Sequence, residues 1–232
     1  MSKTVGLVHA VLPAIAPMQD VLARELPEVR VLNLLDEGLL SEANRLHGLV
    51  PATIDRLASV IGLLAAAQSD AIMLTCTAYS PAVPEMERRF PGLPILAVDQ
   101  TMVEHAVALG TRIGVLATVA AGLEQQRALL REAAERAGKA IEIVPSLHPD
   151  AMDALRRGER DAHDRILLAA LPALLERSDV VLLAQVSISP LAAKLPADLP
   201  KPVLSSPELA AQRLRESLYA ASQAAAPAFE KN

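Results

Sequence analysis

The sequence has no tryptophan, two tyrosines, two phenylalanines and a single cysteine among its 232 residues. So few aromatic side chains leave no platform on which nucleobases could stack. The net charge of −5 also argues against a nucleic-acid partner, because neutralising phosphates requires an excess of lysine and arginine. One cysteine cannot form an internal disulfide, which is typical of proteins from a reducing cytoplasm.

Several functional motifs are missing as well. The chain has no glycine-rich phosphate loop, no GxSxG nucleophile elbow and no pair of histidines at metal-ligand spacing, so we expect neither a nucleotide cofactor nor a metal. The first residues lack the layout of a signal peptide, and the apolar run 61–67 is too short to cross a bilayer. We therefore expect a soluble cytoplasmic protein with no membrane partner.

Aliphatic residues must fill the core, since hydrophobic residues make up 52% of the chain. Short apolar runs predict strands at 4–9, 29–34, 71–74, 94–98, 112–117, 141–144, 180–183 and 203–204. Helical spacing predicts helices at 18–26, 41–68 (bent or interrupted at Pro51), 82–90, 102–109, 120–137, 151–177 (interrupted at Gly158 and Pro172) and 208–221. This alternation is typical of parallel sheets that helices cover on both faces.

The second half of the chain repeats the first. Residues 179–189 align with residues 70–80 without a gap, and residues 113–116 match residues 5–8 at nearly the same offset. Independent matches would have no reason to share a spacing, so the pattern indicates two copies of one unit. We predict an α/β fold of two similar parallel-sheet αβα units, related by a pseudo-two-fold duplication, with the active site in the cleft between them.

The predicted division of the chain follows from this repeat. The first unit comprises residues 1–99 together with a returning C-terminal helix in 207–232, and the second unit comprises residues 100–206. The hinge is expected near Asp99 and again near Pro207. The last residues, 225–232, are expected to be a frayed tail.

The only cysteine, Cys76, lies in a small polar turn between the predicted strand 71–74 and a helix start at Ser80. Open α/β sheets bind ligands beyond the carboxyl ends of their strands, and the free N–H groups of a helix start favour a thiolate. Cys76 is therefore the first candidate for a catalytic residue. The alternative is that it is a small buried hydrophobic residue, as free cysteines commonly are.

These segments resemble the aspartate/glutamate/hydantoin racemase superfamily over nearly the whole length of the chain. The resemblance is carried by Val5-Gly6-Leu7, Thr75-Cys76-Thr77, the segment 113–118 and Leu183-Ala184-Gln185. It implies a cofactor-independent isomerase or racemase-like enzyme that acts at the carbon beside a carboxylate of a small acid, with Cys76 as base or nucleophile. In that family two cysteines, one from each half, exchange the proton on opposite faces of the substrate. Members often form dimers, so a homodimer is one expected state.

The chain departs from the family pattern at Gln185, which stands where the second cysteine would be. An amide cannot carry a proton at neutral pH, so the two-thiol mechanism is not expected in this single-cysteine chain. The alternatives are a one-thiol cis–trans isomerase or decarboxylase of a dicarboxylic acid, or a carboxylate-binding protein without activity. The one-thiol decarboxylases keep the thiol of the second half, whereas this chain keeps that of the first. A lowered pKa of Cys76 would favour an enzyme, whereas an unreactive, buried Cys76 would favour the binding protein.

Removing a proton beside a carboxylate also requires groups that stabilise the enediolate. Backbone N–H groups and hydroxyls in the two turns could do so, including those of Ser189. The expected substrate-binding residues are His9, Thr77, Ala78, Thr118, Gln185, Val186 and Ser187. Two of these have an alternative: Gln185 could orient the ligand or only cap its loop, and His9 could be an acid or base in the cleft or a structural histidine.

The remaining ionisable residues have simpler interpretations. Asp99, at a strand end near the hinge, could act in the site or form a turn. Asp70 and Asp179 precede their strands and are expected to be structural, at the opposite edge of the sheet. The other histidines, expected to be surface or capping groups, are His47, His105, His148 and His163.

Overall fold

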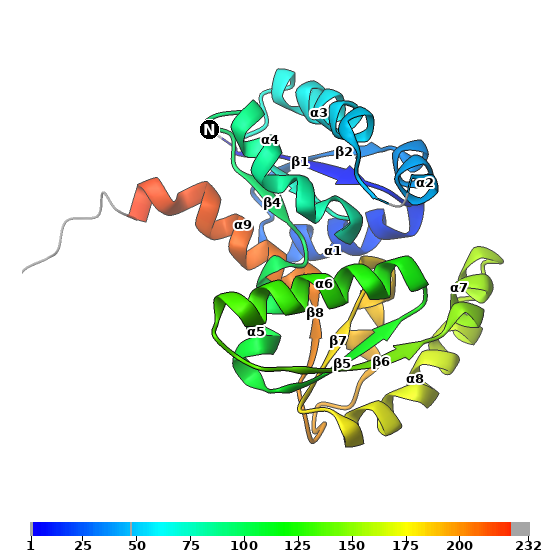
Figure 1. Ribbon diagram of the computed structural model, residues 1–232. Coiled ribbons are helices and arrows are strands. Elements are labelled where there is room, and N and C mark those ends of the chain that lie inside the picture. Colours follow the sequence, from blue (N-terminus) through cyan, green and yellow to red (C-terminus); the bar gives the residue numbers. More distant parts are fainter. Residues whose placement is uncertain (1, 47, 224–232) are drawn as a thin grey trace, which may run out of the picture.

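The computed structural model describes residues 2–46 and 48–223 and shows two stacked α/β units, each built on its own sheet (Figure 1). Both sheets have four parallel strands, in the order β2-β1-β3-β4 in the first and β6-β5-β7-β8 in the second. Adding four to each strand number of the first sheet gives the order of the second, so the two sheets have the same topology. The predicted α/β fold with two similar units is therefore confirmed.

The bounds of the elements agree closely with the apolar pattern of the sequence. The strands are β1 (Thr4–His9), β2 (Arg30–Leu35), β3 (Ala71–Leu74), β4 (Ile95–Ala97), β5 (Arg112–Ala117), β6 (Glu142–Leu147), β7 (Val180–Leu183) and β8 (Val203–Ser205). The α-helices are α1 (Ile15–Glu25), α2 (Glu37–Arg45), α3 (Pro51–Ala66), α4 (Val83–Arg89), α5 (Gln100–Leu109), α6 (Ala120–Arg136), α7 (Pro149–Arg156), α8 (Arg160–Arg177) and α9 (Ser206–Gln223). Three 3-10 helices are η1 (Leu12–Ala14), η2 (Thr77–Ala82) and η3 (Val186–Lys194).

The prolines and one glycine decide where the long helical segments divide. Pro51 occupies the first position of α3, where a proline has no N–H to leave unpaired, so 41–68 divides between two helices. Gly158, with a φ of 79°, separates α7 from α8. The predicted interruption at Pro172 is wrong, because α8 continues through this residue.

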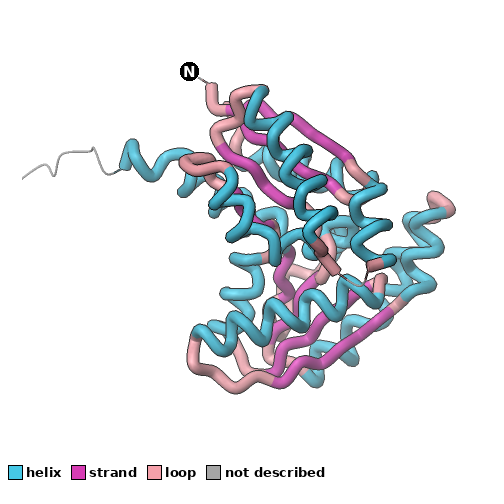
Figure 2. Tube along the Cα trace, turned by 45° about the horizontal axis from the view of Figure 1, so that its top comes forward, coloured by secondary structure: helices cyan, strands magenta, loops and turns pink. Residues whose placement is uncertain are grey.

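Each sheet is covered on both faces, and four apolar clusters form the core (Figure 2). Helices α1 and α9 pack on one face of the first sheet, with α2, α3 and α4 on the other. Helices α5 and α6 pack on one face of the second sheet, with α7 and α8 on the other. Helix α1 also contacts η3, and α6 contacts η2, so each unit touches the turn that follows the third strand of the other.

The C-terminal helix returns to the first sheet after the chain has completed the second. Ala210, Ala211 and Leu214 of α9 are buried in the same cluster as Val5 and Leu22. The division of the chain at 99 and 206 stays a prediction. His47 and the predicted tail 225–232 lie outside the described residues.

Gly6 in β1 and Gly114 in β5 occupy equivalent positions, where a helix approaches the sheet closely. A Cβ added at Gly6 would lie 2.7 Å from Cδ1 of Ile72 and 2.8 Å from Cδ1 of Leu64. A Cβ at Gly114 would lie 2.6 Å from Oγ of Ser178. The duplication therefore preserves a contact that only glycine permits without rearrangement of its neighbours.

The two aspartates that precede β3 and β7 hold the starts of neighbouring strands. Asp70 accepts hydrogen bonds from the Thr4 N–H at 2.8 Å and from Lys3 Nζ at 2.7 Å. Asp179 accepts from the backbone N–H of Arg112 at 2.9 Å and from its guanidinium. These hydrogen bonds lower the pKa of Asp179, with the one from the Arg112 N–H having the largest effect. Both residues are structural, as predicted.

Candidate active site

A cavity of about 660 Å³ lies between the two units and contains the turns that follow β3 and β7. Cys76 enters it from the first unit and Gln185 from the second. The lining residues are Ala10, Val11, Ala14, Leu40, Ala43, Asn44, Gly48, Leu49, Thr75, Cys76, Thr77, Ala78, Pro81, Val119, Ala121, Gly122, Glu124, Gln125, Met152, Gln185, Val186 and Ser187.

Cys76 and Gln185 hold equivalent positions in their units, because each is the residue before a 3-10 helix. The Cys76 carbonyl accepts from the Tyr79 N–H at 2.9 Å, and the Gln185 carbonyl accepts from the Ile188 N–H at 3.1 Å. In each turn, two backbone N–H groups come before the first of these hydrogen bonds along the chain. These four N–H groups have no carbonyl acceptor within their 3-10 turn, and their residues line the cavity. They are those of Thr77, Ala78, Val186 and Ser187.

The Cys76 side chain is a thiol rather than a thiolate at neutral pH. Burial is the main cause and raises its pKa to about 12, and the negative charge of Asp99 acts in the same direction. The Ala78 N–H donates to the sulfur and opposes this shift without reversing it. The expectation that the turn would stabilise a thiolate is therefore wrong, because desolvation outweighs one hydrogen bond, and the lowered pKa that would favour an enzyme is not found.

The Gln185 side chain is fixed by hydrogen bonds within the second unit. Its Oε1 accepts from the Thr118 backbone N–H at 3.0 Å and from the Thr118 hydroxyl at 2.9 Å. Only an oxygen can accept from a backbone N–H, so these bonds determine which end of the amide is Nε2. A Cβ at Gly122 would lie 2.9 Å from this nitrogen. Gln185 therefore caps its loop and lines the cavity at the same time.

His9 does not line the cavity, although its neighbours Ala10 and Thr75 do. It is 0% exposed and has hydrogen bonds at both ring nitrogens, to Asn33 Oδ1 at 3.0 Å and to Thr75 Oγ1 at 2.8 Å. Burial lowers its pKa, so the imidazole is neutral at pH 7. The geometry places His9 as a structural residue that supports Thr75, and we do not assign it to the substrate site.

Most of the hydroxyls expected to face the substrate have hydrogen-bond partners within the protein. Thr77 Oγ1 donates to Asp99 Oδ2 at 2.5 Å, and Ser189 Oγ donates to the Val186 carbonyl at 2.8 Å. The Thr118 hydroxyl donates to Gln185 Oε1, and Thr118 as a residue is 1% exposed. Ser187, which lines the cavity, is the remaining hydroxyl in this group.

The apolar wall of the cavity could not be identified from the sequence. Leu40, Ala43 and Leu49 come from α2 and the segment before α3, and Met152 comes from α7. These residues carry no motif, and only the packing of α2 and α7 near the two turns brings them to the cavity. Among the lining residues that the structure describes, Glu124 is the only charged one, and it pairs with Arg127 at 2.8 Å.

His105, His148 and His163 lie outside the cavity. His105 is exposed, and His148 precedes α7 as its N-cap residue. His163, expected at the surface, is instead 0% exposed, and its Nδ1 lies 2.6 Å from Asp164 Oδ1. The prediction for His163 is therefore wrong, because the adjacent carboxylate supplies a partner that allows the imidazole to be buried.

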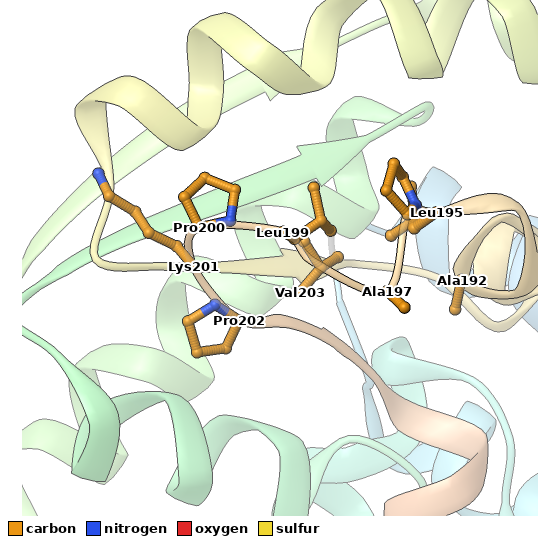
Figure 3. Close-up of a pocket in the computed structure, with 9 residues that line it drawn as sticks. Ala192, Leu195, Ala197, Leu199, Pro200, Lys201, Pro202 and Val203 are labelled. Carbon is orange, nitrogen blue, oxygen red and sulfur yellow. The ribbon is translucent and has the colours of Figure 1, made fainter.

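A second hollow, of about 500 Å³, follows the segment that joins η3 to β8 (Figure 3). Lys201 is its one charged lining residue, and its Nζ donates to the Leu175 carbonyl at 2.6 Å in the last turn of α8. Within the described residues, no cluster of histidine, cysteine or acidic side chains could hold a metal ion. Over residues 2–46 and 48–223, no helix is both long and apolar enough to cross a membrane.

Comparison with known proteins gives a family and a common fold. A family model described as Asp/Glu/Hydantoin racemase matches residues 41–214. Glutamate racemase from Francisella tularensis subsp. tularensis SCHU S4, solved with D-glutamate, has a TM-score of 0.70 at 14% identity, over 95% of this chain and 82% of that chain. Aspartate racemase from Picrophilus torridus has a TM-score of 0.68 at 14% identity, over 93% and 94% of the two chains.

A third similar structure is an arylmalonate decarboxylase, with a TM-score of 0.60 at 16% identity, over 93% of this chain and 92% of that chain. At these identities the structural likeness shows a shared fold and no more. No curated protein matches the sequence.

Proposed function

This chain belongs to the Asp/Glu/hydantoin racemase family, and from that membership we propose that it is a cofactor-independent enzyme that transfers a proton at the carbon beside a carboxylate of a small acid. The observation that carries the proposal is the position of Cys76, at the first 3-10 turn of a cavity shared by the two units. Cys76 is the group that acts on the substrate, as base or nucleophile in an isomerase or racemase-like reaction.

The residues around Cys76 support a bound carboxylate. The N–H groups of Thr77, Val186 and Ser187, and that of Ala78 beside the Cys76 sulfur, are suited to hold an anion and the enediolate that forms from it. The fixed orientation of Gln185 adds amide N–H donors from the second unit. The substrate is therefore proposed to be held by dipoles, since no cationic side chain is among the described lining residues.

The proton can be transferred on one face only. Cys76 is the one lining residue, among those described, with a side chain suited to carry a proton in the reaction, because Glu124 is paired with Arg127 and Gln185 is an amide. A substrate that loses its α-proton to Cys76 recovers a proton from the same thiol. We therefore expect exchange with solvent at the α-carbon with retention of configuration.

A one-thiol decarboxylase is the second candidate, and the protonated state of Cys76 favours it. Loss of CO2 from a malonate-type acid breaks a C–C bond and leaves its electron pair in an enediolate. The Cys76 thiol then donates its proton to the carbon, and water returns a proton to the thiolate. This reaction starts from the thiol, which is the form that burial of Cys76 favours. The apolar wall would accept an uncharged substituent.

Deuterium incorporation from heavy water tests both candidates. Aspartate, glutamate, hydantoins, maleate and arylmalonates are incubated with the protein in D2O, and the products are analysed by mass spectrometry and chiral chromatography. We expect incorporation, isomerisation or CO2 release with one class of acid, and loss of at least a hundredfold in rate in Cys76→Ala. The reason is that no other side chain among the described lining residues is suited to carry the proton.

Ser80→Ala is the matched control. Ser80 follows Cys76 by four residues, and its buried hydroxyl has no hydrogen-bond partner in the described part of the chain, so its removal should leave the rate unchanged. Full activity in Cys76→Ala would refute the role of the thiol. Carboxylate binding without any conversion would instead favour a binding protein that has lost turnover.

A further inference from the structure

One buried carboxyl group lies between the two units and next to the proposed catalytic turn. Asp99 is 0% exposed and precedes α5, where the chain crosses from the first unit to the second. Its Oδ2 accepts a hydrogen bond of 2.5 Å from the hydroxyl of Thr77, the residue after Cys76. Within the described residues, its Oδ1 has no hydrogen-bond partner.

The surroundings of Asp99 reach the second unit as well. Ser206, the first residue of α9 at the return crossover, and Gln126 of α6 are both 0% exposed, and their side chains favour the charged form of Asp99. Gln126 Nε2 also donates to the Ala184 carbonyl at 3.4 Å, immediately before Gln185. The cluster therefore connects both turns of the cavity with both crossovers.

We propose that Asp99 is a positioning residue: its carboxylate holds the Cys76 turn through Thr77, and its negative charge adds to the burial that keeps Cys76 in the thiol form. The inference rests on the proposed function only in taking Cys76 as the reacting group. Asp99 itself does not line the cavity, so it acts through Thr77 and through its charge.

The negative charge of Asp99 disfavours the thiolate form of Cys76. A thiolate beside a carboxylate is disfavoured by repulsion between like charges, and the charge of Asp99 raises the pKa of Cys76. The side chains that contact Asp99 from the neighbouring elements are neutral: Thr77 from η2, Gln126 from α6 and Ser206 from α9. Burial raises the pKa of Asp99 to about 6, so Asp99 changes charge in a range that is readily measured.

Reaction of the single cysteine with a dipyridyl disulfide, between pH 4 and pH 9, tests the proposal without any turnover. The logarithm of the rate should rise with pH, flatten near pH 6 as Asp99 becomes charged, and then rise again. Asp99→Asn should remove the flattening and react about three to ten times faster than the parent at pH 8, as expected for a loss of one nearby charge. Identical profiles of the parent and Asp99→Asn would overturn the proposal.

Two further variants complete the experiment. Asp164→Asn removes a different buried carboxylate, which is bonded to His163 and Lys194, and should keep the flattening near pH 6. Thr77→Val removes the donor to Asp99, so the flattening should move to higher pH. If Asp99→Asn does not fold, Thr77→Val decides: a shifted flattening supports the proposal, and an unshifted one contradicts it. Because the assay needs no substrate, an inactive protein would not affect its outcome.

Discussion

Two residues at equivalent positions give this chain its chemical asymmetry. Cys76 and Gln185 both precede a 3-10 helix and both line the cavity, yet only Cys76 can carry a proton. Gln185 is not an inert replacement, since it satisfies both the N–H and the hydroxyl of Thr118. The second unit thus presents an amide where the family pattern has a second thiol.

Replacing Gln185 by cysteine should restore a proton carrier to the second unit. We expect Gln185→Cys to convert exchange with retention into racemisation of the same substrate, measured by chiral chromatography. Gln185→Ser is the matched control, because serine has nearly the same shape but a hydroxyl of much higher pKa. Both variants lose the acceptor for Thr118 and should be destabilised by about 1–3 kcal/mol. Racemisation in both variants, or in neither, would contradict the predicted role of the thiol.

At the scale of elements, the contact between the first strand of each unit and the adjoining helix limits which residues the strand can contain. Gly6 faces Leu64 of α3, and Gly114 faces Leu174 of α8. A methyl group at either glycine would meet buried side chains at distances that real Cβ atoms avoid. The sheet could then keep its place only if the helix moved outward.

Gly6→Ala should therefore lower the free energy of unfolding by about 1–3 kcal/mol, measured by urea titration, because the core there has no space to spare. Gly62→Ala is the matched control within α3. A Cβ at Gly62 meets nothing within 4 Å, so alanine should raise stability by about 0.5–1 kcal/mol through its helix propensity. Equal effects of the two substitutions would show that close packing does not decide the outcome.

At the scale of the whole molecule, the two units are joined by buried polar groups as well as by apolar packing. Helix α9 completes the core of the first unit, and Asp99, Gln126 and Ser206 lie buried around the crossovers. A buried carboxylate without a cationic partner is unfavourable, and burial raises the pKa of Asp99 to about 6. Stability should therefore depend on pH through this residue.

Asp99→Asn should be more stable than the parent at pH 8 and equal to it near pH 4. The folded protein binds the Asp99 proton more tightly than the unfolded chain, so this contribution to stability is lost as the pH rises from about 4 to about 6. The difference should reach about 2–3 kcal/mol above pH 7. Urea unfolding at several pH values measures it. A difference that does not change with pH would contradict the shift.

Comparing the parent with Asp99→Asn also separates this residue from His9. Burial lowers the pKa of His9, so stability from that residue rises with pH as the unfolded imidazole loses its proton. The two contributions oppose each other in the parent, but His9 contributes equally to both proteins. Only the difference between them reports on Asp99.

The sequence by itself determined the fold class, the duplication and the position of the thiol. Apolar runs placed each strand within a few residues, and the nearly equal offsets of residues 113–116 and 179–189 predicted two copies of one unit, which the structure shows as two sheets. These features are local or periodic: a strand needs a run of apolar residues, and a turn needs small polar ones. Cys76 could be identified because it stands where such a run ends.

Only the tertiary structure decided what surrounds that thiol. Burial and the charge of Asp99 make Cys76 a thiol at neutral pH, although its turn alone favours a thiolate. The apolar wall that includes Leu40 and Met152 comes from segments far apart in the chain, and His9 is buried outside the cavity lining with bonds to Asn33 and Thr75. Desolvation and long-range contacts depend on how distant elements pack, and no local pattern of residues encodes them.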